Sequence, residues 1–400
     1  MSRAAERIAV TKPYIFQTLH EMKLEAVARG VDVIDLGVGN PDQRPDPEII
    51  RALHEELDDE RVANHSYPPY AGLPEFRDAI ATWYRRRFDV AVDPGKEVLP
   101  LVGTKEGLGH LLLAVIDPGD AVLVPSPAYP AYIGAATVAQ AEVVEMPLRE
   151  ETGFRIEVDR ISESDARRAK LMIVNYPGNP TGACCDLAHY REIHEFARAH
   201  DLIVASDIAY ADLTLDPGAL APSFLEVPGA KELAVEFYSF SKTYSMAGWR
   251  VGFAAGNAEL VRLLLKLKSN LDFGVFPAIQ RAAARTLLGS RRPIDDLCET
   301  YRRRRDLLAA GLREAGWDVA APEASMYLWT RIPPGHESSF AFVRALFEKT
   351  GVLLSPGSGF GEAGEGFVRV SLVVGEARLR EVARRVRESG LCAPRAAPAA

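Results

Sequence analysis

The stretch that decides the fold reads Ser239-Phe240-Ser241-Lys242-Thr243-Tyr244-Ser245-Met246-Ala247-Gly248-Trp249-Arg250-Val251-Gly252. It follows an apolar segment, residues 233–238, whose pattern predicts a buried strand. A lysine at the end of such a strand is hard to explain by packing, because lysine is almost never fully buried without a partner. Loss of water around the amine would lower its pKa toward that of a nucleophile. Lys242 is therefore a candidate for covalent chemistry.

The usual chemistry of such an amine is a Schiff base with an aldehyde, and pyridoxal phosphate (PLP) is the usual aldehyde. The hydroxyls beside Lys242, those of Ser239 and Ser241, would then hold the phosphate together with Arg250. The stretch therefore predicts a PLP site built around Lys242.

Length, composition and charge limit the class of protein. Four hundred residues exceed what one core usually spans, so two domains are expected. The composition, 48% hydrophobic and 26% charged, is ordinary for a soluble globular protein. The net charge of -8 argues against a general affinity for nucleic acid. Four cysteines, two of them adjacent, match neither a disulfide framework nor a zinc site, so no metal is predicted.

The N-terminal sequence bears on the expected location of the protein. The first seven residues are charged but are not followed by an apolar region, so a secretory signal is not expected. No apolar run approaches the roughly 18 residues that a membrane helix needs. A cytoplasmic protein is predicted, with a disordered Ala/Pro-rich tail at 392–400.

Short apolar runs alternate with helical patterns through the middle of the chain. The candidate strands are 98–102, 121–124, 171–174, 202–205, 235–238 and 251–254. Nearly all-apolar strands in such an alternation predict an α/β fold with a mostly parallel, doubly wound sheet. Past about residue 290 the pattern indicates a smaller α+β domain. The expected parts are an N-terminal arm with part of the small domain (1–45), a large domain (46–290) and a small C-terminal domain (291–391).

Ligands of doubly wound sheets bind beyond the carboxyl ends of the strands. After the first candidate strand, Gly103-Thr104-Lys105 opens a helix, and a helix N-terminus favours a phosphate. After the second strand, Tyr129 could stack on a flat ring, although a simple turn tyrosine is an alternative. The phosphate end of the cofactor is thus expected near residue 104.

Three further side chains follow strands or lie within one. Asn179 belongs to a rigid loop rich in proline and glycine, from which its amide can project. Asp207 ends a buried strand, where a protonated pyridine nitrogen could be its partner; a helix N-cap is the alternative. Arg369 alternates with apolar residues, so its guanidinium would be buried and would need a carboxylate from the protein or from a substrate.

Together these motifs resemble the class I/II aminotransferases, the PLP enzymes of fold type I, from about residue 34 to residue 386. The most specific matches are Asn175-x-Pro177-x-Asn179-Pro180-Thr181-Gly182, Asp207-x-x-Tyr210, and Ser239-x-Ser241-Lys242 with Gly248-Trp249-Arg250. The resemblance implies a large domain with a doubly wound sheet and a smaller α+β domain. It also implies a ping-pong exchange of an amino group between an L-amino acid and a 2-oxo acid, with 2-oxoglutarate and glutamate as the expected second pair.

The resemblance also implies a role for each candidate residue. Lys242 would form the Schiff base and carry the proton, Asp207 would pair with the ring nitrogen, and Tyr210 would contact the 3-oxygen with Asn179. The residues implied for the ring face and the phosphate are Tyr129, Gly103, Thr104, Lys105, Ser239, Ser241 and Arg250. The residues implied for the substrate carboxylate are Arg369, Asn179 and Gly39. Tyr67 would reach the phosphate of a partner subunit, which implies a homodimer.

Within the family the chain resembles two subgroups, the LL-diaminopimelate aminotransferases and the bacterial alanine aminotransferases. Lys268-Ser269-Asn270-Leu271-Asp272 favours the first, whereas Phe273, Ala324-Ser325-Met326-Tyr327 and Ala209-Tyr210-Ala211-Asp212 favour the second, and both stay open.

Two other functions are compatible with a PLP site. A lyase or synthase on the same fold would share every cofactor residue. A non-catalytic PLP-sensing regulator would need a DNA-binding domain, and only about 34 residues precede Asp35-Leu36-Gly37.

Overall fold

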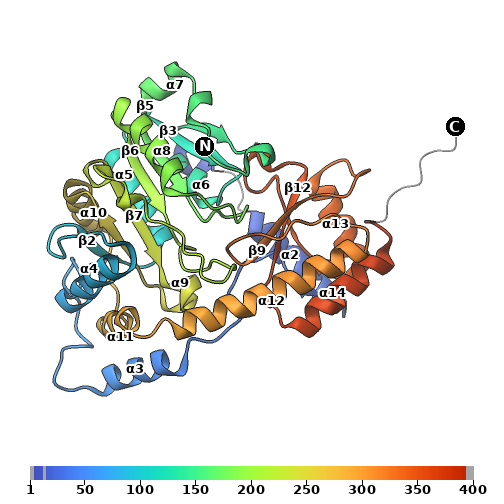
Figure 1. Cartoon of the computed structure of the whole chain (residues 1–400), viewed down its shortest axis with the longest axis horizontal. Helices are drawn as coiled ribbons and strands as arrows, with labels where there is room; N and C mark the ends of the chain where they lie inside the picture. The colour runs from blue at the N-terminus through green and yellow to red at the C-terminus, as the bar shows by residue number, and fades with distance from the viewer. Residues whose placement is uncertain (1–3, 12–14, 393–400) are drawn as a thin grey trace.

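A computed structural model gives the structure of the chain and describes residues 4–11 and 15–392. Its strands form a seven-stranded sheet, a three-stranded sheet and a two-stranded pair, with helices around them (Figure 1). The order in the large sheet is β2-β8-β7-β6-β5-β3-β4. These strands are β2 (Val98–Leu101), β3 (Ala121–Ser126), β4 (Glu142–Pro147), β5 (Ala169–Asn175), β6 (Ile203–Asp207), β7 (Ala234–Ser239) and β8 (Gly252–Gly256).

The large sheet is parallel except for β8, which runs antiparallel to both β7 and β2. The chain passes from β7 to β8 through the single-turn α9 (Phe240–Thr243) and the short η5 (Ala247–Trp249). This link lacks the long crossover helix that usually joins parallel neighbours, so the chain returns antiparallel. The predicted mostly parallel, doubly wound sheet is confirmed.

Helices bury both faces of the large sheet. Side chains alternate between the faces along each strand, so the nearly all-apolar strands present an apolar surface on both sides. Leu171 and Ile173 of β5 pack into one core, whereas Met172 and Val174 pack into the other. The first core includes α5 (Thr104–Val115), α6 (Ala131–Val138) and α10 (Ala258–Leu271). The second includes α4 (Pro74–Phe88), α8 (Leu187–Ala199) and α11 (Pro277–Leu288), with α3 (Pro47–Asp58) packed on α11.

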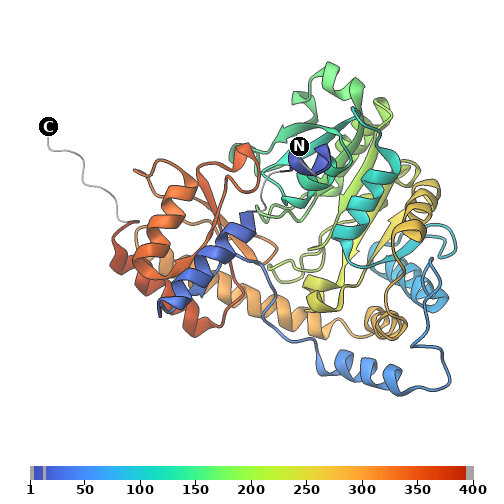
Figure 2. The same cartoon turned by 180° about the vertical axis from the view of Figure 1, so that it is seen from behind.

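The smaller domain joins the C-terminal part of the chain to a segment near the N-terminus. Its three-stranded antiparallel sheet contains β11 (Ser355–Pro356), β12 (Phe367–Ser371) and β9 (Tyr327–Arg331). β1 (Ile34–Asp35) pairs in parallel with β10 (Val352–Leu353). The helices of this domain are α2 (Ile15–Ala28), α12 (Arg292–Glu314), α13 (Ser339–Thr350) and α14 (Glu376–Ser389). Figure 2 shows α2, in blue, lying against the orange and red C-terminal part.

The remaining α-helices of the described residues are the short α1 (Glu6–Ala9) and α7 (Glu163–Arg168). Among the helices in 4–11 and 15–392, none combines the length and apolar character of a membrane span. Of the predicted tail, Cys392 is described and buried, and 393–400 lie outside the described residues. The predicted domain limits and the cytoplasmic location stay predictions.

Candidate active site

A cavity of about 300 Å³ lies where the carboxyl ends of the parallel strands meet the smaller domain. Most of the side chains predicted from sequence line it, although they come from both domains. These residues are Gly39, Thr104, Lys105, Tyr129, Asn179, Asp207, Tyr210, Ser239, Ser241, Lys242, Arg250 and Arg369. The cavity therefore brings together residues that are far apart in the chain.

Lys242 enters this cavity from α9, the short helix that begins where β7 ends. Ser239 caps this helix, because its hydroxyl accepts the Ser241 N–H at 3.2 Å. The Lys242 amine donates to the Gly39 carbonyl at 2.8 Å. Burial lowers the pKa of the Lys242 amine, and the positive charges of Arg369 and Arg250 lower it further. A lowered pKa increases the fraction of neutral, nucleophilic amine near neutral pH.

Asp207 ends β6, the central strand of the sheet, with its carboxyl group buried. Tyr132 Oη donates to Asp207 Oδ2 at 2.7 Å, and the Ala209 N–H donates to Oδ1 at 3.0 Å. Burial raises the pKa of Asp207 to about 6. No helix begins at residues 208–215, so the N-cap alternative is wrong. The environment of Asp207 suits a cationic partner in the cavity, such as a protonated ring nitrogen.

Arg369 lies in the middle of β12 and is only 2% exposed. Its Nη1 donates to Asn179 Oδ1 at 2.9 Å and its Nη2 to the Gly37 carbonyl at 2.7 Å. Within 4–11 and 15–392, no carboxylate forms an ion pair with Arg369, and its Nε is buried without a hydrogen-bond partner. Such a buried guanidinium has the charge and the geometry to bind the carboxylate of a ligand.

The loop that carries Asn179 is tied to the strand beside it. Asn175 Oδ1 accepts the Asn179 N–H at 2.9 Å, and Asn175 Nδ2 donates to the Asp207 carbonyl at 2.8 Å. These bonds tie the Asn179 backbone to the ends of β5 and β6, and the Asn179 side chain contacts Arg369. Asn175 was not among the predicted site residues.

Positive groups gather at the end of the cavity beside α5. Thr104 and Lys105 form the first turn of this helix, whose free N–H groups favour an anion. The Arg250 guanidinium donates to the Ala247 carbonyl at 2.9 Å and lies against Gly103, where a Cβ atom would collide with it. Burial lowers the pKa of Lys105, and the neighbouring Arg250 charge lowers it further. This combination fits the dianionic phosphate of PLP.

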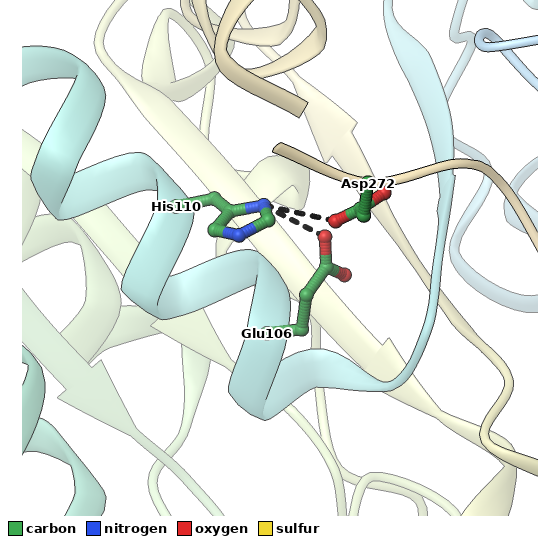
Figure 3. A group of neighbouring side chains, drawn as sticks. All are labelled: Glu106, His110 and Asp272. Carbon is green, nitrogen blue, oxygen red and sulfur yellow. Dashed lines mark ion pairs between the residues drawn. The ribbon is translucent and has the colours of Figure 1, made fainter. Parts of the chain in front are cut away.

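An ion cluster underlies this positive end (Figure 3). Glu106, His110 and Asp272 point toward one another, and their ligand atoms lie close enough to surround a metal ion. However, the buried Lys268 amine lies 3.0 Å from Glu106 Oε1 and 2.6 Å from Asp272 Oδ1, and so supplies the counter-charge itself. Glu106 Oε2 also accepts the Val102 N–H at 3.1 Å. The cluster therefore anchors the strand end that leads into the phosphate-binding turn.

The two remaining aromatic candidates lie in different surroundings. Tyr129 lines the cavity half-buried, and its ring meets the edge of the Tyr132 ring at 5.7 Å. Tyr67 does not line the cavity: it is 80% exposed and stacks on Phe273, with ring centroids 4.3 Å apart. The cavity of one chain thus lacks Tyr67.

Sequence reasoning missed three aromatic side chains of the site. Tyr132 binds Asp207, Tyr327 lines the cavity beside Tyr210, and Phe16 lines it from the start of α2. Of these only Tyr327 belongs to a motif used in the sequence analysis, Ala324-Ser325-Met326-Tyr327, where it helped to distinguish two subgroups. The sequence around Tyr132 and Phe16 contains no pattern that indicates a role in the site.

A family model and the relatives found by sequence comparison agree on the family of this chain. Residues 31–386 match the model for aminotransferase class I and II. The LL-diaminopimelate aminotransferase of Desulforudis audaxviator is 45% identical over 383 residues, which cover 96% of this chain and 97% of that relative. The enzyme of the same name from Nitratidesulfovibrio vulgaris is 46% identical over 388 residues, 96% of this chain and 98% of that relative.

Two solved structures share the fold along almost the whole chain. Substrate-bound BacF from Bacillus subtilis has a TM-score of 0.94 at 36% identity and covers 100% of both chains. A probable N-succinyldiaminopimelate aminotransferase from Thermus thermophilus has a TM-score of 0.88 at 39% identity, over 94% of this chain and 100% of that one.

Proposed function

Because the chain belongs to the class I and II aminotransferases and is thus a PLP-dependent transaminase, we propose that it takes the amino group of LL-diaminopimelate and passes it to 2-oxoglutarate. The donor is inferred from relatives that bear this name at 45–46% identity over 96% of the chain. The observation that carries the site assignment is Arg369, whose buried guanidinium pairs with no carboxylate of the described residues and lines the cavity that also holds the Lys242 amine.

The cofactor site is proposed from the fit of the cavity to each part of PLP. When bound, PLP supplies an aldehyde that links to an amine and a cationic ring that accepts electrons from the α-carbon. Asp207 would hold the proton on the ring nitrogen, Tyr210 and Asn179 would bind the 3-oxygen, and Tyr129 would cover the ring. The phosphate would be held by Ser239, Ser241, Arg250 and the turn formed by Gly103, Thr104 and Lys105.

Substrate binding and proton transfer are assigned to two side chains. Arg369 would bind the α-carboxylate in bidentate fashion, with Asn179 and the backbone of Gly39 beside it. This contact would hold the donor in the cavity that the Lys242 amine also lines. The amine of Lys242, whose pKa is lowered by burial, would then take the proton from the α-carbon as a general base.

We also infer a homodimer. Tyr67, Tyr70 and Phe273 form an exposed stack. The centroid of the Phe273 ring lies 5.3 Å from that of Tyr70 and 4.3 Å from that of Tyr67. Large aromatic side chains exposed together are typical of a protein interface. In such a dimer, as the family resemblance implies, the Tyr67 hydroxyl would contact the phosphate bound by the partner subunit.

A donor panel tests the proposed reaction. Purified enzyme with PLP is mixed with LL-diaminopimelate, alanine or aspartate, and conversion of the bound cofactor to its amine form is followed by absorbance. We expect kcat/KM for LL-diaminopimelate to exceed the other two by at least about tenfold, and glutamate to form when 2-oxoglutarate is added. Faster conversion by alanine would overturn LL-diaminopimelate as the donor and indicate an alanine aminotransferase. Products of elimination without glutamate would favour the lyase or synthase alternative.

A further inference from the structure

Two buried phenols meet at the inner wall of the cavity. Tyr210 follows β6 of the large sheet, and Tyr327 begins β9 of the small sheet. Their hydroxyl oxygens lie 3.1 Å apart, and their rings meet edge to face with centroids 5.9 Å apart. The pair therefore joins the two domains through one hydrogen bond in the site.

Backbone pairing sets the distance between the two phenols. The segment after Tyr210 runs beside the segment before Tyr327: the Leu215 N–H donates to the Glu323 carbonyl at 2.7 Å. The Ser325 N–H donates back to the Leu213 carbonyl at 2.8 Å. These two bonds fix both backbones within a few residues of the phenols, so the contact between the hydroxyls is held from both sides.

Side chains of the site hold the Tyr327 ring from its other sides. The Arg369 guanidinium carbon lies 4.1 Å from the ring centroid, in cation–π contact. The hydroxyl lies against Gly39, where a Cβ atom would overlap it. The Gly39 carbonyl accepts the Lys242 amine at 2.8 Å. Tyr327 thus contacts both the residue proposed for the substrate carboxylate and the glycine that binds the reactive lysine.

The number of hydrogens decides the direction of the phenol pair. Each phenol has one hydrogen to donate. If Tyr210 donates its hydrogen to the 3-oxygen of PLP, as the proposed function requires, then Tyr210 can only accept from Tyr327. An anionic 3-oxygen is the stronger acceptor, so this is the favoured order of donors.

We propose that Tyr327 is a positioning residue for Tyr210: its hydroxyl donates to Tyr210 Oη and so directs the Tyr210 hydrogen at the 3-oxygen of PLP. The inference rests on the proposed function, because it needs PLP bound with its 3-oxygen next to Tyr210. A residue of the small domain would thereby orient a cofactor contact of the large domain.

The charges around the pair favour the same direction. Burial and the neighbouring Tyr327 raise the pKa of Tyr210. Burial alone would raise the pKa of Tyr327 as well, but in the ligand-free chain the positive charges of Lys242 and Arg369 lower it, and the Arg369 charge remains beside Tyr327 when Lys242 is linked to PLP. The more acidic phenol is the better donor, so Tyr327 is suited to donate and Tyr210 to accept.

The test is a visible absorbance titration of the holoenzyme, which reports the apparent pKa of the linkage between Lys242 and PLP. A phenol that donates to the 3-oxygen stabilises the deprotonated linkage, because that oxygen then carries its full negative charge. Tyr210→Phe should therefore raise the apparent pKa. Tyr327→Phe should raise it by about 0.5 to 1, the effect of one typical hydrogen bond.

Two further measurements separate positioning from a general loss of structure. The dissociation constant of PLP should rise about two- to tenfold in Tyr327→Phe. In the double variant the apparent pKa should equal that of Tyr210→Phe alone, because Tyr327 acts through Tyr210. Tyr301→Phe is the matched control: Tyr301 is buried in the same domain, its hydroxyl has no hydrogen-bond partner among the described residues, and its titration should match the wild type.

The outcomes distinguish this inference from the function on which it rests. If Tyr210→Phe shifts the titration and Tyr327→Phe does not, or if the two shifts add in full, Tyr327 has no positioning role although the site assignment stands. If Tyr210→Phe causes no shift, or if the wild type shows no visible PLP absorbance, the proposed cofactor site fails and this inference fails with it.

Discussion

Replacing Arg369 by lysine tests the substrate site most directly. The lysine keeps the positive charge but loses the planar fork that binds a carboxylate through two parallel bonds. It also loses the bonds to Asn179 Oδ1 and to the Gly37 carbonyl, at 2.9 and 2.7 Å, which aim the fork into the cavity. A hydrogen bond between charged groups contributes about 1.5 to 3 kcal/mol. Loss of one such bond would raise the barrier by about 1.5 to 3 kcal/mol, so we expect kcat/KM to fall roughly 10- to 160-fold.

The assay compares two amines in the half-reaction, followed by absorbance of the bound cofactor. One is the amino donor, and the other is the same amine without its α-carboxylate. Arg369→Lys should slow the first and leave the second within about twofold. Equal losses for both amines would refute the assignment, because a carboxylate site cannot act on a substrate without one. Thermal unfolding of the variant shows whether the buried lysine has disturbed the fold.

Three further predictions follow from the same geometry. Lys242→Ala should abolish the visible absorbance band of the covalent linkage between Lys242 and PLP, and nearly all turnover; substantial remaining transamination would remove Lys242 from its role. Asp207→Asn should stabilise the PLP-free protein at pH 7 to 8, by up to about 2 to 3 kcal/mol, because burial raises the Asp207 pKa to about 6 from 3.8. Because the Asp207 pKa is higher in the folded state, the wild type loses stability as the pH rises from 3.8 to 6, and the advantage of the variant should vanish below about pH 4. Urea unfolding at several pH values measures the difference between the two proteins. A difference that does not depend on pH would contradict the assignment of the shift. Tyr67→Phe should weaken PLP binding several-fold without changing the sedimentation coefficient. Tyr70→Phe, in the same exposed stack, should leave PLP affinity unchanged. Equal PLP affinity in Tyr67→Phe and the wild type would argue against a contact across the dimer.

Local sequence signals were sufficient for much of the site. Lys242, Asp207 and Asn179 each follow an apolar strand, and the carboxyl ends of parallel strands meet at one edge of a sheet. The prediction that these side chains share a cavity needed only the strand pattern, and the structure confirms that they line it. Arg369 was predicted because a charged side chain among apolar neighbours in a strand must be buried.

Contacts between distant segments were beyond the reach of the sequence. Tyr132 lies 75 residues from Asp207, and Tyr327 lies 117 residues from Tyr210, with no local pattern to link either pair. The same holds for the reversed direction of β8, which depends on how a short link folds back after Lys242. Tyr327 in particular was visible only as a residue that differs between subgroups.

The sequence by itself determined which side chains stand at the ends of strands, and therefore which side chains face the cofactor site. This works because apolar runs and turns are local properties, and a strand of known direction presents its last residues at a known edge. Only the tertiary structure decided which partners complete those side chains, because a hydrogen bond such as that of Arg369 to Gly37, 332 residues apart, depends on how the two domains pack together.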